Sequence, residues 1–210
     1  MNIDYEIYYS HPSISKDGCL EAVGEKTLTL LNTETGKKVI SFSGHTHGIN
    51  CSDFSHDGKY VLSGSGDNWS PYDFTVRIWD IGSGKMFAKF KSNYAGIIDA
   101  KFAPDNEHVL ILDHDHIFYR YSISQKKVIH TQRPKCLVLP TKGSSVVKDG
   151  RIIIHKELIA SLIDNNLVFW DWNSGVIKHK LDGVYGLGKI TFNENECTVI
   201  FNNEKYSFSL

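Results

Sequence analysis

The chain has 210 residues, of which 41% are hydrophobic and 12% aromatic, and its formal net charge is −1. This composition excludes a disordered or fibrous protein and supplies enough apolar residues for the core of one sizeable domain. Its 23 Lys and Arg residues are scattered among 24 Asp and Glu residues, so the sequence predicts neither a nucleic-acid-binding nor a membrane-binding surface.

The N-terminus and the cysteines bear on the cellular compartment. The first residues, MNIDYEIYY, lack the basic-then-apolar pattern of a signal peptide, and no apolar run approaches the roughly 18 residues of a membrane span. The four cysteines form no Cys-x-x-Cys pair, which argues against a zinc or redox site; they are Cys19, Cys51, Cys136 and Cys197. We therefore expect an intracellular protein, cytoplasmic with a nuclear location left open, whose thiols are buried and reduced.

The stretch from Gly44 to Lys85 has the clearest secondary-structure pattern. Apolar and polar residues alternate in short runs, which are separated by turn residues at His56–Gly58 and Gly84–Lys85. This pattern predicts a four-stranded antiparallel sheet. The expected strands are Ile49–Ser55, Lys59–Ser65, Thr75–Ile81 and Met86–Phe90.

The same pattern recurs along the chain. Thr27–Lys37 aligns with Thr75–Lys85, and Ser15–Gly18 aligns with Ser55–Gly58. Anchor positions follow at intervals of 48, 42, 49 and 40 residues, and they are Leu31, Trp79, Tyr121, Trp170 and Leu210. An acidic residue stands six positions before each anchor, at Glu25, Asp73, Asp115, Asp164 and Glu204. A period of this length is typical of arrays of four-stranded sheets.

Within one repeat, Gly44-His45 stands early and Trp79-Asp80 late, and this arrangement resembles the WD-repeat β-propeller family. The resemblance implies an all-β fold, a β-propeller of four-stranded antiparallel blades, of which about five are visible. We expect a single domain over residues 1–210, with blades at 3–43, 44–90, 91–131, 132–182 and 183–210. Residues 132–150 are rich in Pro, Gly, Ser and Lys, and we assign them no strand.

In the family that this sequence resembles, a turn Asp, the His of Gly-His, a strand Ser or Thr and the Trp form one hydrogen-bonded network. Carried over to this chain, the set is Asp73, His45, Ser63 and Trp79. Other repeats have matching structural positions at Asp115, Asp164 and Trp170. The pattern is broken at Leu31, Asn93 and Tyr121. We expect these incomplete repeats to be held mainly by apolar packing, because a half-satisfied buried network costs stability.

The ends of the chain leave the closure of the array open. Residues 3–9 have the alternation of a strand, and in the family an N-terminal strand commonly completes the last blade. We expect it here as the missing outer strand, which leaves the first blade only residues 10–15, with Pro12 among them. Two alternatives follow: a closed ring of few blades, or a partial propeller whose open edges need a partner chain or missing sequence, or self-associate.

By the same resemblance we expect a non-catalytic scaffold or adaptor that binds other proteins through the loops between its strands, with no cofactor and no metal. Residues 66–72 lengthen one such loop and carry Trp69 and Tyr72, residue types that are enriched at interfaces. The alternative is that Trp69 packs back onto its own blade. Further residues expected on this binding face are His47, Tyr94 and His114.

Two residue clusters suggest other functions. Asp113–His116 contains metal-ligand residue types and would suit a propeller enzyme or a metal-dependent protein, but neighbours in a strand point to opposite faces. His45, Ser63 and Asp73 have the composition of a catalytic triad, yet no Gly-x-Ser-x-Gly motif accompanies them. We assign both clusters to structure and expect no enzyme. A truncated propeller without independent function is a third alternative.

Overall fold

The computed structural model describes residues 3–7, 13–66, 73–93, 95–115, 117–132, 152–155, 158–163, 166–171, 174, 176–184, 188–201 and 203–209. In these ranges the secondary structure consists of β-strands, arranged as five four-stranded antiparallel sheets. The expected all-β class is thereby confirmed. The chain divides into two compact units, residues 12–146, here the central unit, and residues 1–11 with 147–210, here the terminal unit. The single-domain organisation and the blade limits stay predictions.

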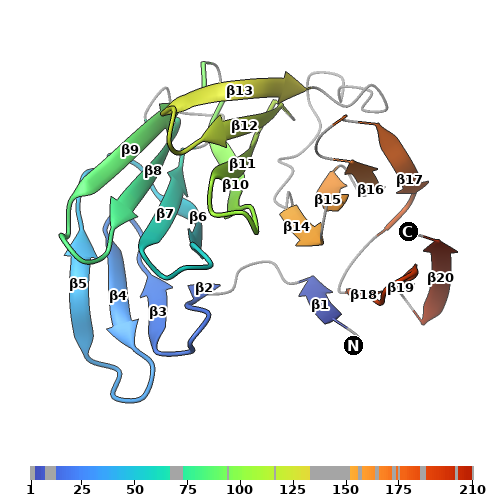
Figure 1. Ribbon diagram of the computed structural model, residues 1–210, viewed down its shortest axis with the longest axis horizontal. Helices are drawn as coiled ribbons and strands as arrows, with labels where there is room; N and C mark the ends of the chain where they lie inside the picture. Colours follow the sequence, from blue (N-terminus) through green and yellow to red (C-terminus); the bar gives the residue numbers. More distant parts are fainter. Residues whose placement is uncertain are drawn as a thin grey trace. The chain divides into compact units, whose positions relative to one another are not determined.

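The central unit contains three sheets whose strands follow chain order (Figure 1). The first sheet comprises β2 (Ser13–Ile14), β3 (Leu20–Val23), β4 (Leu28–Asn32) and β5 (Lys38–Phe42). The second comprises β6 (Ile49–Phe54), β7 (Tyr60–Ser65), β8 (Thr75–Asp80) and β9 (Met86–Lys91). The third comprises β10 (Ile97–Phe102), β11 (His108–Asp113), β12 (Phe118–Ser122) and β13 (Lys127–Gln132). Every strand expected between Gly44 and Phe90 is present to within one residue at each end.

The repeated sequence Ser-x-Asp-Gly produces the same turn in two sheets. Ser55 Oγ donates to Asp57 Oδ1 at 2.8 Å and accepts a hydrogen bond from the Tyr60 N–H at 2.9 Å. Ser15 Oγ donates to Asp17 Oδ1 at 2.6 Å in the first sheet. A glycine follows each Asp with positive φ, 75° at Gly18 and 71° at Gly58. The turn is a property of the local sequence, since glycine adopts this conformation without steric cost.

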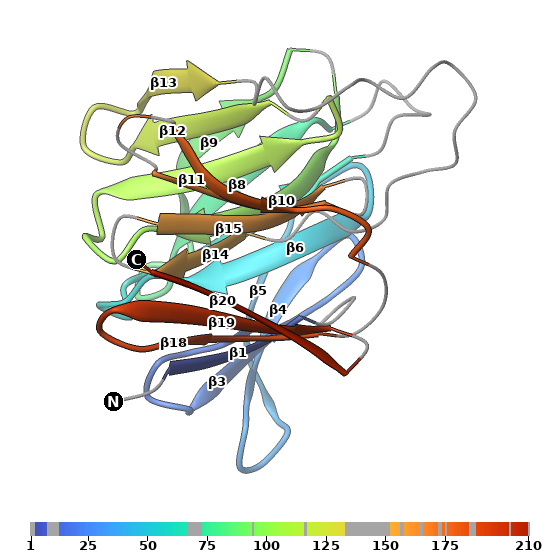
Figure 2. The ribbon, with the colours of Figure 1, turned by 90° about the vertical axis from the view of Figure 1, so that its right-hand side faces the viewer.

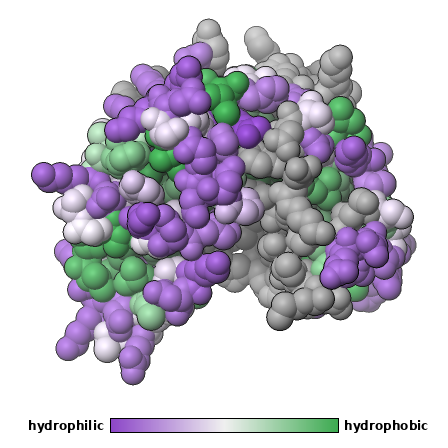
Figure 3. Space-filling view, viewed as in Figure 1, coloured by the Kyte–Doolittle hydropathy of each residue, from purple (hydrophilic) through white to green (hydrophobic). Residues whose placement is uncertain are grey.

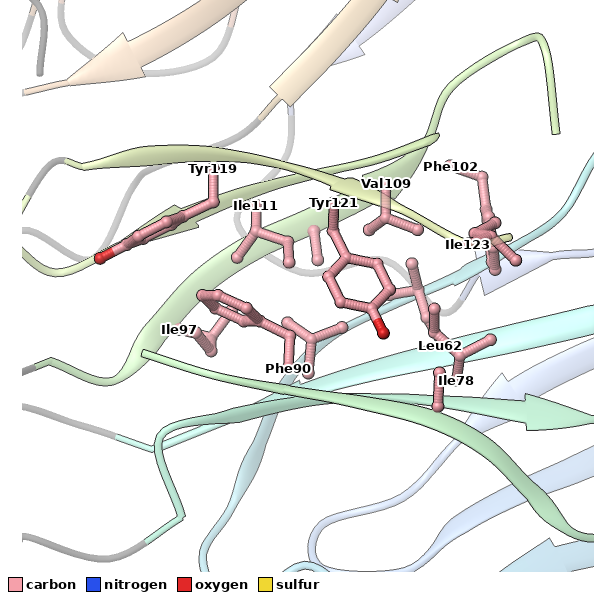
Figure 4. Close-up of a cluster of buried hydrophobic side chains, with 13 residues drawn as sticks. Leu62, Ile78, Phe90, Ile97, Phe102, Val109, Ile111, Tyr119, Tyr121 and Ile123 are labelled. Carbon is pink, nitrogen blue, oxygen red and sulfur yellow. The ribbon is translucent and has the colours of Figure 1, made fainter. Parts of the chain in front are cut away.

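Apolar side chains fill the space between neighbouring sheets of the central unit. Trp79 of β8 stacks on Phe42 of β5 at 5.3 Å between ring centroids. The second and third sheets share a larger apolar cluster, in which the ring centroids of Phe90 and Tyr119 are 4.9 Å apart (Figure 4). The residues of that cluster labelled in the figure are Leu62, Ile78, Phe90, Ile97, Phe102, Val109, Ile111, Tyr119, Tyr121 and Ile123. Burial of these side chains is the main favourable contribution to the free energy of folding.

Polar side chains also connect the second sheet to the third. Asn50 Nδ2 donates to the carbonyl oxygen of Ile97 at 2.8 Å, so it joins β6 to β10. At the other end of the same strands, the Phe102 N–H donates to Asp53 Oδ2 at 2.8 Å, and Lys101 Nζ lies 3.5 Å from Asp53 Oδ1. The two sheets are therefore linked at both ends of their facing strands.

The terminal unit contains two sheets. One comprises β14 (Ile152–His155), β15 (Leu158–Ile163), β16 (Asn166–Asp171) and β17 (Ile177–Leu181). The other comprises β1 (Ile3–Ile7), β18 (Gly188–Phe192), β19 (Glu196–Phe201) and β20 (Glu204–Ser209). Fully buried Phe169 and Phe192 contribute to the apolar core that the two sheets share.

The N-terminal strand completes the last sheet, as expected, but at the other edge. β1 pairs antiparallel with β18, with Ile3 opposite Phe192 and Ile7 opposite Gly188 (Figure 2). The strand order is β1-β18-β19-β20, so β1 does not provide the outer strand beside β20. The expectation of an outer N-terminal strand is wrong because alternation shows that a segment is a strand and does not show which edge it joins.

The exposure of the cysteines differs from the expectation that their thiols are buried. Cys197 is buried, but Cys19 is exposed because it follows the turn at Asp17-Gly18. Cys51 is half-buried, and Cys136 lies outside the described residues.

Of residues 132–150, only Gln132, the last residue of β13, is described. Outer strands of the central unit expose Val39, Met86 and Ile129. Figure 3 shows a largely hydrophilic face with some hydrophobic patches. No helix in the described part of the chain is long and apolar enough to cross a membrane.

Candidate functional site

Four side chains of the second sheet meet in a buried hydrogen-bond network. Trp79 Nε1 donates to Ser63 Oγ at 2.9 Å, and Ser63 Oγ lies 2.7 Å from His45 Nε2. On the other side of the ring, His45 Nδ1 lies 2.9 Å from Asp73 Oδ2. The network therefore runs from Trp79 through Ser63 and His45 to Asp73, in the order that the resemblance implies.

The donors and acceptors of this network fit a neutral imidazole. Ser63 Oγ accepts from the indole N–H and can donate its own proton to His45 Nε2, which leaves the proton of the imidazole on Nδ1 to be donated to Asp73. Burial lowers the pKa of His45, and the positive charge of Arg77 adds to this effect, while Asp73 opposes it. The neutral form is thus the one that the buried site favours.

Asp73 holds the turn that precedes β8. Its φ is 58°, and its carboxylate accepts hydrogen bonds from the Thr46 N–H at 2.6 Å and from the Thr75 hydroxyl. Arg77 forms an ion pair with it at 3.4 Å. Although burial alone would raise the pKa of Asp73, hydrogen bonds from Thr75, Thr46 and His45 keep that pKa below its usual value. The ionised carboxylate therefore fixes the turn to the start of β8 and to the segment that precedes β6.

We expect the stability of the protein to fall as the pH drops through the ordinary pKa of histidine, 6.5. The pKa of His45 is lowered in the folded state, so the unfolded chain binds the proton more readily, and stability present above pH 6.5 is lost below it. Urea unfolding at about pH 7 and about pH 5 measures this loss. In the His45→Gln variant the loss should shrink, whereas exposed His56→Gln should behave like the wild type; equal losses in all three would contradict the assignment.

The third sheet has a different network, centred on Asp113. The Tyr119 hydroxyl donates to Asp113 Oδ2 at 2.8 Å, the Ser92 hydroxyl donates to the same oxygen at 2.9 Å, and the Ile117 N–H donates to Oδ1 at 2.9 Å. Asp113 is fully buried, and burial raises its pKa even though these hydrogen bonds oppose the shift. Sequence reasoning missed Asp113 as a network residue and named its neighbour Asp115, whose N–H donates to Asp113 Oδ1 at 3.0 Å.

The strand register explains why the network of the third sheet differs from that of the second. Tyr121 lies opposite Val109 as Trp79 lies opposite Val61, so Ile111 takes the place of Ser63. With no hydroxyl at that place, Tyr121 cannot enter a Trp-Ser-His network, and it packs instead near Phe90 at 6.4 Å. A signal for this was present in the sequence, since the apolar residue at position 111 removes the central hydroxyl of the network.

The structure describes some of the residues expected on the binding face. His47 lies half-buried just before β6, and its carbonyl oxygen accepts a hydrogen bond from Ser65 Oγ at 3.1 Å. His114 lies half-buried in the turn after β11, and its N–H donates to the carbonyl oxygen of Gly96 at 2.9 Å. The other three expected residues lie outside the described residues, and they are Trp69, Tyr72 and Tyr94.

The remaining expected positions are in the third and fourth sheets. Trp170 is buried on β16, opposite Ile159 of β15, and Asp164 lies outside the described residues. In the Asp113–His116 segment, His116 is likewise outside them. The described part of the chain contains no group of three or more His, Cys, Asp or Glu residues placed to hold a metal ion. The carboxylate of Asp113 is already occupied by the hydrogen bonds of its own sheet.

A four-stranded antiparallel sheet with a buried Trp-Ser-His-Asp network is the arrangement that the resemblance to the WD-repeat family implies. Comparison with known proteins agrees: the family described as WD domain, G-beta repeat matches residues 36–80, which include the whole of this network. Residues 36–80 of the chain therefore carry a WD repeat.

Two kinds of relative share part of the sequence. Eukaryotic translation initiation factor 3 subunit I of Xenopus tropicalis is 38% identical over 60 residues, which is 29% of this chain and 17% of the relative; the Homo sapiens protein of the same name matches to the same extent. Transcription initiation factor TFIID subunit 5 of Caenorhabditis elegans is 28% identical over 92 residues, 44% of this chain and 13% of the relative. The chain thus spans less than a fifth of the length of these relatives.

Proposed function

We propose that the chain is a non-catalytic scaffold that holds other proteins through the loops between its strands. Two findings support the proposal: the WD repeat at residues 36–80, and relatives whose names describe them as subunits of a translation factor and of a transcription factor. The proposed partners are proteins in the interior of the cell, in the cytoplasm or the nucleus. Fold alone does not name them.

The observation that carries the proposal is the anchoring of the loop between β7 and β8. At its start, Ser65 Oγ donates to the Gly48 carbonyl oxygen at 2.7 Å. At its end, Asp73 is held by Thr46, Thr75, Arg77 and the buried ring of His45. A loop fixed at both ends loses less conformational entropy when it binds a partner. Residues 67–72, with Trp69 and Tyr72, lie outside the described residues, and their binding role belongs to the proposal.

Affinity capture with matched variants tests this proposal. We expect Trp69→Ala combined with Tyr72→Ala to lose the proteins that the wild-type chain recovers from a cell extract, because aromatic anchors supply most of the binding energy of an interface. Tyr206→Ala, which removes an aromatic residue that is 37% exposed on β20, is the control and should recover the same proteins as the wild type. Equal recovery by all three chains would show that the loop is not the binding site.

A further inference from the structure

The second sheet carries a cluster of positive charges on one face. Trp79 of β8 faces the first sheet, where it stacks on Phe42. Arg77 stands two residues before Trp79 on the same strand, so it shares that face. In the neighbouring outer strand Lys89 lies opposite Arg77, and Lys91 follows two residues further along β9. These three residues, here the basic cluster, therefore project from one face of β8 and β9.

Positive charge on this face exceeds the negative charge beside it. Lys89 and Lys91 are exposed, and neither forms an ion pair or a side-chain hydrogen bond with any residue in the described part of the chain. The carboxylate that reaches the cluster is that of Asp73, which pairs with Arg77 at 3.4 Å, is almost completely buried and already accepts from the Thr46 N–H. Like charges opposite each other in a sheet are destabilising, so an anion that bridges Arg77 and Lys89 would relieve their repulsion.

The guanidinium of Arg77 is held in place but not fully used. Nε donates to Thr75 Oγ1 at 3.3 Å, and Nη2 donates to Asp73 Oδ1 at 3.4 Å. The guanidinium lies against Gly44, where an added Cβ would come within 2.1 Å of Nη1. Nη1 donates to no residue in the described ranges, and the side chain of Arg77 is 14% exposed. Arg77 can therefore bind an anion at little cost in conformational entropy.

Protection of the sheet edge does not account for the whole cluster. Lysines on an outer strand oppose the pairing of strands. In the central unit β5 and β13 each carry one lysine, and the residue opposite it is uncharged, Leu31 and Ser122 respectively. The outer strand β9 differs, because Lys89 and Lys91 share one face and a third cation, Arg77, lies opposite Lys89. This excess of charge is what the edge alone does not require.

We propose that the basic cluster binds an acidic segment of a partner protein, in an extended conformation with carboxylates at alternate positions. Alternate side chains of an extended chain lie on one face about 7 Å apart, as Lys89 and Lys91 do on β9. One carboxylate pairs with Arg77 and Lys89, and the next pairs with Lys91. The formal net charge of the whole chain is −1, so the positive charge is local and suits a short acidic segment better than a nucleic acid or an anionic membrane.

Fluorescence anisotropy with a labelled peptide of alternating Glu and Ser tests the proposal, and the same peptide with Gln in place of Glu is the probe control. We expect the wild-type chain to bind the Glu peptide more tightly than the Gln peptide. Lys89→Glu combined with Lys91→Glu should weaken binding of the Glu peptide about tenfold or more, because repulsion replaces each attraction. Lys89→Gln combined with Lys91→Gln should give a smaller loss.

A charge-matched control separates the basic cluster from net charge. Lys37→Glu combined with Lys38→Glu changes the net charge equally, at exposed positions of the first sheet, and should bind the Glu peptide like the wild type. Circular dichroism shows whether the variants remain folded. Equal weakening by the two double Glu variants, equal binding of the Glu and Gln peptides, or no binding by the wild type would overturn the proposal.

The same assay distinguishes other occupants and the loop between β7 and β8. Oligo(dT) and phosphatidylserine vesicles should bind more weakly than the Glu peptide; tighter binding of either, lost in Lys89→Glu with Lys91→Glu, would contradict an acidic protein segment. The basic cluster does not include residues 67–72. Trp69→Ala with Tyr72→Ala should therefore bind the Glu peptide like the wild type, whether or not it loses the proteins recovered from a cell extract.

Discussion

Replacing Trp79 with alanine is expected to lower the free energy of unfolding by about 3–5 kcal/mol, as measured by urea denaturation. The indole is 4% exposed, stacks on Phe42, and lies edge-on to the ring of His45 at 6.4 Å between centroids. The change removes a large apolar contact between the first and second sheets and also leaves Ser63 Oγ without its donor. Both losses act on buried groups, and they therefore add to the cost.

Trp79→Phe separates the two contributions. Phenylalanine retains much of the apolar contact with Phe42 but cannot donate to Ser63. We expect this variant to lose about 1–2 kcal/mol, because Ser63 Oγ loses the hydrogen bond from the indole and keeps only the one to His45. If Trp79→Phe lost as much stability as Trp79→Ala, the hydrogen bond to Ser63 would contribute more than the apolar contact with Phe42. A loss of less than about 1 kcal/mol in Trp79→Ala would contradict both contributions.

The second large effect is expected from Asp113→Ala, which should lower the free energy of unfolding by about 3 kcal/mol or more. The change leaves the buried hydroxyls of Ser92 and Tyr119 without their carboxylate and removes the acceptor of the Ile117 and Asp115 N–H groups. The loss is expected even though burial raises the pKa of Asp113, because the removed side chain satisfies several donors at once.

Asp115→Ala is the matched control for this experiment. It removes the neighbouring carboxyl that the sequence pattern identifies, but it keeps the backbone N–H that donates to Asp113. The negative charge of Asp115 contributes to raising the pKa of Asp113, so its removal also relieves a repulsion. We expect a clearly smaller loss of stability than for Asp113→Ala. The reverse order would restore Asp115 as the main acid of the third sheet.

Much of the fold could be predicted because its signals are local. The alternation of β6 to β9 and the Ser-x-Asp-Gly turns at Ser15 and Ser55 are encoded in neighbouring residues. The edge that β1 joins is not encoded in this way, because an alternating strand can pair with either edge of a sheet. Exposed Cys19 shows the same limit, since a residue type has an average burial and its turn decides the individual case.

The site was predictable to the same degree. His45, Ser63, Asp73 and Trp79 could be named because one repeat retains the whole pattern. In the third sheet the acceptor moved to Asp113, and this depends on Ser92 and Tyr119, which reach it from 21 and 6 residues away. Residues that come together only through the pairing of β11 with β12 and the path of the chain after β9 are not visible as a motif.

The side-chain links between β6 and β10 affect how the central unit opens. Asn50 binds the backbone of β10 at Ile97, and Asp53 binds it at Phe102, so separating the two sheets breaks hydrogen bonds at both ends of the facing strands. If the second sheet opened, the carbonyl oxygen of Ile97 and the N–H of Phe102 would lose these side-chain partners. We therefore expect the second and third sheets to unfold as one cooperative unit. Loss of either repeat in evolution would then require replacement of Asn50 and Asp53 as well.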